Sequence, residues 1–176
     1  MKSLRLVALG ALLTVGAFSA VVYTSCSKDA CSGVTCQNSG TCSGGTCTCP
    51  SGIGGTNCET IYRTGYTNTY KGNGTADTLS FTNYRMVFTA TGTDLTKMSL
   101  QLQDATGTGV IPIMVVDLAN NTSTGSTFTI ESTTGGGYTY TGNGTVSGTV
   151  ASMNLVETPV SGGSATSYTF SNMVKQ

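Results

Sequence analysis

Between residues 60 and 176 the chain consists of short segments in which apolar and polar side chains alternate. The segment KMSLQLQD places Met98, Leu100 and Leu102 on one face and polar side chains on the other, which is the two-residue period of a half-buried β-strand. Further segments alternate in the same way, namely YRMVFTA, STFTIES, ASMNLV and SYTFS. The segment VIPIMVV is apolar throughout, which predicts a strand covered on both faces, and Pro112 within it predicts a bend or a sheet edge.

Loop-forming residues separate these segments. Gly, Asn, Pro and Ser gather in DATGTG, LANNTSTG, STTGGG and TPVSGGSAT, which are typical of hairpin loops and too short to contain crossover helices. We therefore expect an all-β fold for residues 60–176, an antiparallel meander of about eight strands that closes into a barrel. This succession of neighbouring strands resembles the lipocalin-like and calycin-like barrels. A two-sheet sandwich is the alternative.

The pattern Tyr-x-Gly-Asn-Gly-Thr occurs twice, beginning at Tyr70 and at Tyr140. The glycines beside Asn73 and Asn143 predict positive φ angles in a bulge or tight turn. Alternatively, the two turns lie together at one end of the barrel and form a binding rim. The first interpretation is favoured, because Gly-Asn-Gly commonly serves backbone geometry alone.

The N-terminus has a different pattern, MKSLRLVALGALLTVGAFSAVVYTSC, in which Lys2 and Arg5 precede an apolar stretch. A basic start, an apolar middle and a small polar end are the three parts of an export signal. The stretch approaches the length of a membrane-spanning helix. However, glycine and hydroxyl residues interrupt it, and no basic stop-transfer run follows. We therefore expect residues 1–25 to be a signal peptide.

The chain contains seven cysteines, and an odd number leaves one without a disulfide partner. Cys26 follows Thr24 and Ser25 at the end of the apolar stretch. This resembles the lipobox of Gram-negative bacterial lipoproteins, although Tyr23 stands where leucine is usual. The resemblance implies that Cys26 becomes the first mature residue and carries both a thioether-linked lipid and an N-acyl chain, the two signals that stable anchoring requires.

The resemblance further implies a lipidated linker over residues 26–30 and attachment to the outer membrane. The tail SKDA after Cys26, with its acidic Asp29, is similar to the signals that send some lipoproteins to the cell surface. The alternative for this tail is a solvated linker.

The other six cysteines lie in residues 31–58 with the spacing C-x4-C-x5-C-x4-C-x-C-x8-C. This spacing, with CQNSGTC and CTCPSGIGGTNCE, resembles the epidermal-growth-factor-like (EGF-like) module. Ser39 replaces a glycine of the family pattern, and Ile53 stands where an aromatic residue is frequent. Spacing alone leaves many connectivities open. The resemblance implies the pairs Cys31–Cys42, Cys36–Cys47 and Cys49–Cys58.

This segment contains few apolar residues beyond Val34 and Ile53, so disulfides must hold it together. A zinc cluster is the competing interpretation, but structural zinc sites favour closely spaced cysteine pairs in reducing compartments. Calcium-binding EGF-like modules carry an acidic run before the first cysteine, whereas this chain has Lys28, Asp29 and Ala30. We expect no calcium, no other metal and no cofactor.

Composition excludes several function classes. Charged residues make up 9% of the chain, and eight basic residues balance eight acidic ones, so no cationic surface is available for nucleic acid. Histidine and tryptophan are absent, and nucleophilic catalysis therefore lacks its commonest base. The carboxylates occur singly, although two could meet in space as a glycosidase pair. We expect a protein that is not an enzyme.

Two hypotheses for function remain. The first is a surface lipoprotein that acts as a non-catalytic binding or adhesion module for an extracellular protein or glycan. The second is a carrier that holds a small apolar ligand inside its barrel. An open apolar cavity favours the carrier, whereas a filled core favours the binding module. The sequence does not indicate an oligomeric state. The candidate ligand-binding residues are Tyr84, Phe88, Leu100, Phe128 and Tyr140.

Overall fold

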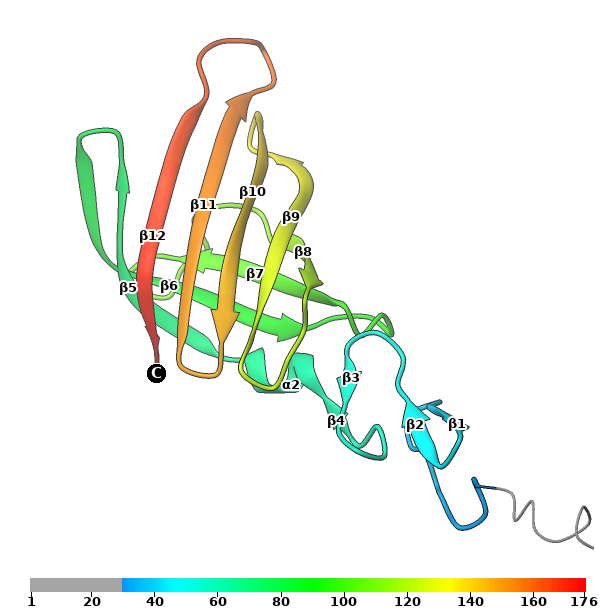
Figure 1. Cartoon of the computed structure of the whole chain (residues 1–176). Helices are drawn as coiled ribbons and strands as arrows, with labels where there is room; N and C mark the ends of the chain where they lie inside the picture. The colour runs from blue at the N-terminus through cyan, green and yellow to red at the C-terminus, as the bar shows by residue number, and fades with distance from the viewer. Residues whose placement is uncertain (1–29) are drawn as a thin grey trace, which may run out of the picture.

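The computed structural model describes residues 30–176. The predicted signal peptide, Cys26 and the predicted linker as far as Asp29 lie outside the described residues. A small module with three disulfides is followed by a large β-barrel, and the module lies at one end of that barrel (Figure 1). Within residues 30–176, no helix has the length and apolar character needed to cross a membrane.

The barrel is built from eight antiparallel strands. Each strand pairs with its sequence neighbours, and β12 pairs with β5 to close the ring. The predicted all-β barrel is therefore confirmed, and the sandwich alternative is excluded. The strands are β5 Thr69–Ala76, β6 Leu79–Ala90, β7 Lys97–Gln103, β8 Met114–Ala119, β9 Gly125–Gly135, β10 Tyr138–Ser147, β11 Val150–Pro159 and β12 Thr166–Lys175.

Alternation places apolar side chains on the inner faces of the strands. In β7, Met98, Leu100 and Leu102 are buried, and the residues between them are half-buried. The segment VIPIMVV differs from expectation, because β8 begins only at Met114 and its burial alternates. Ile113 is 59% exposed. The first part of the segment is instead a connection between β7 and β8, since proline cannot donate to a strand ladder.

Large side chains fill the middle of the barrel. Tyr70, Phe88 and Phe128 form a row of rings with edge-to-face contacts, at centroid distances of 5.7 Å and 5.5 Å. Fully buried methionine and leucine side chains pack around this row. Burying one side chain of this size stabilises the fold by about 1.5–3 kcal/mol relative to leaving it exposed. The middle of the barrel is therefore a packed core.

The two Tyr-x-Gly-Asn-Gly-Thr segments lie within β5 and β10. Register shifts in the neighbouring pairings confirm the predicted bulges, but no residue of either segment has a positive φ angle. The glycines are required for close approach instead. The rings of Phe81 and Phe170 lie against Gly74, and the ring of Phe128 lies against Gly144. Because both segments lie within strands and not in turns at a barrel end, the predicted rim of two neighbouring turns is not formed.

One end of the barrel, which we call the closed end, is covered by the short helix α2 (Tyr62–Tyr66). The Tyr66 hydroxyl donates to the Thr122 carbonyl, and the Tyr70 hydroxyl donates to the Ser147 carbonyl. The Arg63 guanidinium donates to four carbonyl groups at the β6–β7 connection, at 2.7–3.2 Å. The bonds of Tyr66 and Arg63 tie the helix to the β8–β9 and β6–β7 connections, and the bond of Tyr70 ties β5 to the end of β10.

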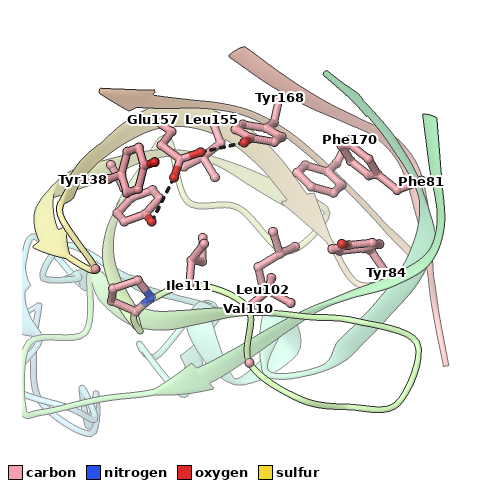
Figure 2. A pocket seen from close by; sticks show the side chains of 14 residues that line it. Phe81, Tyr84, Leu102, Val110, Ile111, Tyr138, Leu155, Glu157, Tyr168 and Phe170 are labelled. Atoms are coloured by element: carbon pink, nitrogen blue, oxygen red, sulfur yellow. Dashed lines mark hydrogen bonds between the residues drawn. The ribbon is translucent and has the colours of Figure 1, made fainter. Parts of the chain in front are cut away.

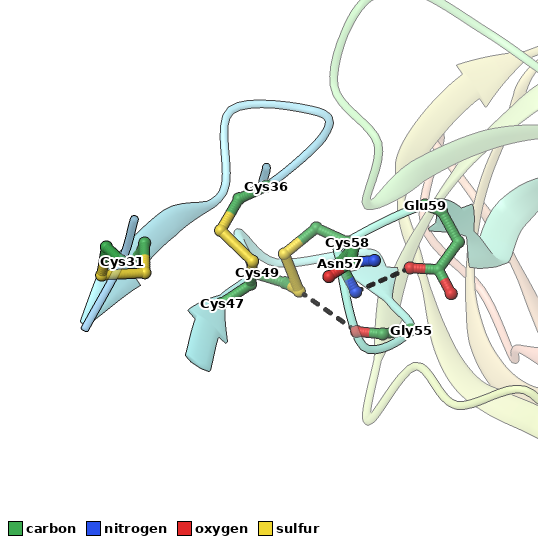
Figure 3. The surroundings of a disulfide bond; sticks show 9 residues. Cys31, Cys36, Cys47, Cys49, Gly55, Asn57, Cys58 and Glu59 are labelled. Atoms are coloured by element: carbon green, nitrogen blue, oxygen red, sulfur yellow. Dashed lines mark hydrogen bonds between the residues drawn. A yellow bond between two sulfur atoms is a disulfide. The ribbon is translucent and has the colours of Figure 1, made fainter. Parts of the chain in front are cut away.

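The small module contains the three disulfides, and Cys58 lies on the side of the module that faces the barrel (Figure 3). Its four short strands are β1 Thr41–Ser43, β2 Thr46–Thr48, β3 Ile53–Gly54 and β4 Thr60–Ile61. The disulfides join Cys31 to Cys42, Cys36 to Cys47 and Cys49 to Cys58. These are the pairs that the EGF-like resemblance implies, and the cysteines therefore do not form a zinc cluster.

The module is connected to the closed end by a short ribbon. Strand β4 opens the region predicted as the β-domain, yet it pairs with β3 of the module. The Tyr62 backbone N–H donates to the Gly52 carbonyl at 3.0 Å. Because Tyr62 is also the first residue of α2, the ribbon leads directly into the helix that covers the barrel.

Candidate functional site

A cavity of about 570 Å³ opens at the end of the barrel opposite α2, which we call the open end (Figure 2). Its lining comes from the inner faces of β6, β7, β10, β11 and β12, from the β7–β8 connection and from the β9–β10 turn. The lining residues are Phe81, Tyr84, Leu102, Gly109, Val110, Ile111, Pro112, Gly136, Tyr138, Tyr140, Leu155, Glu157, Tyr168 and Phe170. Its volume falls within the usual range for small-molecule sites.

Strand β11 places a carboxylate in this cavity. Ala151, Met153 and Leu155 are buried on its inner face. Because strand side chains alternate with a period of two, Glu157 is the next residue on that face. It is half-buried, and it lies beyond the layer that Leu155 fills. The inner face of β11 thus changes from apolar to charged where the packed core ends.

Two tyrosines hold the Glu157 side chain. The Tyr168 hydroxyl donates to Oε2 at 2.6 Å, and the Tyr140 hydroxyl donates to Oε1 at 3.2 Å. The hydrogen bond to Glu157, followed by burial, raises the pKa of Tyr168 to about 12. Burial, followed by the charge of Glu157, raises the pKa of Tyr140. Both phenols therefore remain neutral donors well above physiological pH.

Aromatic rings line the cavity on either side of the carboxylate (Figure 2). Phe81, Tyr84 and Phe170 contact one another with centroid distances of 5.1–6.1 Å. Tyr138 lies beside Tyr140 at 6.5 Å. Leu102, Val110 and Ile111 form an aliphatic side that faces Glu157 across the cavity. The cavity is therefore lined by aromatic and aliphatic side chains together with phenol hydroxyls and one carboxylate, a combination that occurs in small-molecule sites.

The five candidate ligand-binding residues separate into two groups. Tyr84 and Tyr140 line the cavity. Phe88, Leu100 and Phe128 do not line it, because they lie in the packed core at 1% exposure or less.

Sequence reasoning missed several lining residues, above all Glu157 and Tyr168. The two-residue alternation of inward-facing side chains could have identified both residues. Glu157 continues the series of buried residues on β11, and Tyr168 shares a face with Phe170.

The chemistry available at the site is binding through one carboxylate, two phenols and several rings. Glu157 is the one acid among the cavity-lining residues. Across residues 30–176, no cluster of three or more His, Cys, Asp or Glu side chains is arranged to hold a metal ion.

Replacing Glu157 with glutamine is expected to lower the pKa of Tyr168 from about 12 toward its ordinary value of 10. The reason is that the variant lacks the carboxylate, which opposes phenolate formation through its hydrogen bond to the Tyr168 hydroxyl and through its negative charge. Because folding raises the pKa of Tyr168, the protonated phenol stabilises the folded protein. This stabilisation is complete below pH 10 and is lost as the pH rises toward 12. The readout is tyrosinate absorbance during alkaline titration of the folded protein. Tyr168→Phe identifies the late-titrating group, and an unchanged Glu157→Gln curve would contradict the assignment.

Comparisons with known proteins identify no relative of this chain. The description of the cavity, its carboxylate and its rings therefore rests on this structure alone. No protein-family model, curated protein or solved structure matches the chain.

Proposed function

We propose that this protein is a lipid-anchored, non-catalytic binding protein that takes a small, largely apolar ligand into the open end of its barrel. The observation that carries the proposal is the cavity of about 570 Å³ lined by aromatic and aliphatic side chains. A water-filled apolar cavity gains free energy when an apolar ligand replaces the water. Stability alone does not require this cavity, because larger side chains could fill the open end as they fill the middle of the barrel.

The arrangement combines parts of the two functional hypotheses. The filled middle of the barrel is what a binding module requires, and the open end supplies the apolar cavity of a carrier. The ligand is therefore bound near the surface and not enclosed at the centre. A glycosidase pair requires two carboxylates about 5–10 Å apart, and only Glu157 lines this cavity, which supports the non-catalytic role.

The proposed anchor is Cys26, and it gives the protein an orientation. The lipobox resemblance supports attachment to the outer membrane of a Gram-negative bacterium, and the SKDA tail after Cys26 supports display at the cell surface. The module, which we propose to be EGF-like, follows the anchor and joins the closed end of the barrel. In this arrangement the module is a short spacer, and the open end of the proposed lipocalin-like barrel faces away from the membrane.

The proposal is tested by filling the cavity. Ile111 is half-buried and lines it. A tryptophan at this position would occupy space that the ligand needs. We expect Ile111→Trp to weaken binding of the neutral apolar dye N-phenyl-1-naphthylamine by at least about tenfold, measured by dye fluorescence.

The matched control is Ile113→Trp. This residue lies in the same connection, is 59% exposed and does not line the cavity. Because the natural chain has no tryptophan, each variant also carries a single indole that reports on the connection. We expect the control to bind the dye within about twofold of the natural protein. Equal weakening of dye binding in both variants would count against a ligand site at the open end.

A further inference from the structure

The negative charge of Glu157 is not balanced by a cation of the described chain. None of the Lys and Arg side chains in residues 30–176 lines the cavity, and none forms an ion pair with Glu157. Lys97 pairs with Glu131, and Arg63 donates to carbonyl groups at the closed end. The two tyrosines each donate one hydrogen bond to Glu157. Each carboxylate oxygen can accept a further bond.

The rings beside Glu157 suit a positive charge as well. A cation placed over an aromatic face gains about 0.5–1 kcal/mol at exposed sites and about 2 kcal/mol or more where water is removed. Tyr138 and Tyr168 lie on the same side of the cavity as the carboxylate (Figure 2), and Tyr140 donates a hydrogen bond to it. Phe81 and Phe170 continue the aromatic lining. An ammonium group in this region could contact Glu157 and the tyrosine rings together.

A neutral or anionic ligand would use this site less well. A neutral apolar molecule would cover Glu157 and remove its water without supplying a counterion, which is costly for a charged group. An anion would in addition be repelled. A cation supplies the missing charge, and the aliphatic side formed by Leu102, Val110 and Ile111 remains free for an apolar body.

The geometry points to an organic cation as the ligand, an amine or quaternary ammonium group on a small apolar body, with the cationic end held between Glu157 and the tyrosine rings. This inference rests on the proposed function, because it names the ligand class of the same cavity. The charged group lies among Tyr138, Tyr140 and Tyr168, and the apolar body lies along the aliphatic side.

The test compares three probes of equal chain length: octylammonium, octanol and octanoate. Calorimetry at neutral pH is expected to show octylammonium binding at least about tenfold more tightly than octanol, with octanoate the weakest of the three. Glu157→Gln is expected to weaken octylammonium binding about tenfold and to leave octanol binding unchanged or tighter, because the cost of covering a charged group is removed. The control is Glu131→Gln, which removes an equal charge from the outer face and should change neither affinity.

The possible results distinguish the inferred preference for a cation from the proposed apolar binding site. If octanol binds the natural protein as tightly as octylammonium does, the cation preference is wrong and the apolar binding site stands. If Glu157→Gln and Glu131→Gln weaken octylammonium binding equally, the effect is one of net charge and the assignment to Glu157 is wrong. If neither the neutral dye nor any of the three probes binds, the proposed function itself fails.

Discussion

Replacing Gly144 with alanine is expected to lower the free energy of unfolding of the barrel by about 3 kcal/mol, the upper part of the range for overpacking a core. A Cβ atom at this position would lie closer than 3.0 Å to the Ser152 carbonyl and to the ring of Phe128. Relief requires the neighbouring strand to move or the ring to leave the row that fills the barrel. Since Phe128 contacts Phe88 edge to face, the disturbance reaches the centre of the core.

The matched control is Gly148→Ala, in the connection between β10 and β11. A Cβ atom there would meet nothing within 4 Å, and the φ angle lies outside the left-handed region. This change also restricts the unfolded chain, so we expect an effect between zero and a stabilisation of about 1 kcal/mol. Urea unfolding followed by circular dichroism measures both variants. Equal loss of stability in the two would show that Gly144 is not required for close packing.

The barrel could be predicted from alternation because a two-residue period assigns each side chain to a face. In β7, for example, Met98, Leu100 and Leu102 are buried as the pattern predicts. The period carries less information where a run is apolar throughout. The segment VIPIMVV therefore predicted a strand covered on both faces, with a bend or a sheet edge at Pro112. In the structure Pro112 lies in a connection and β8 begins at Met114.

The roles of the repeated glycines could not be predicted from the sequence. A glycine that permits a positive φ angle and a glycine that permits a ring to approach look identical in the chain. Gly74 and Gly144 belong to the second kind, and their partners Phe81, Phe170 and Phe128 lie on other strands. Only the register of the closed barrel brings each ring over its glycine.

The carboxylates show why only part of the site could be predicted from the sequence. An acid beside turn residues commonly caps the turn. Asp94 and Asp104 do so, because each accepts a backbone N–H bond from the residue two positions later, at 2.9 Å and 2.8 Å. Glu157 also lies near a strand end, but its position continues the inner-face series of β11. Whether that layer is filled or open depends on Ile111 and its neighbours in the β7–β8 connection, which no local pattern determines.

Replacing Cys26 with serine is expected to abolish attachment to the membrane, because a thioether cannot form without the sulfur. A single acyl chain gives only marginal and reversible membrane binding, so losing the lipidated cysteine removes stable anchoring altogether. The natural protein should partition into the detergent phase, and its N-terminal peptide should carry the added mass of the acyl chains. Ser27→Ala is the matched control, since it alters the next residue and retains the sulfur.

The same variant separates the anchor from the binding site. The cavity belongs to the barrel, and its lining begins at Phe81, so Cys26→Ser protein recovered in soluble form should bind the neutral dye within about twofold of the natural protein. Recovery of Cys26→Ser from membranes in the same amount as the Ser27→Ala control would overturn the lipid anchor. In that case the apolar stretch before Cys26 would itself have to hold the protein in the membrane, as the alternative of a spanning helix requires.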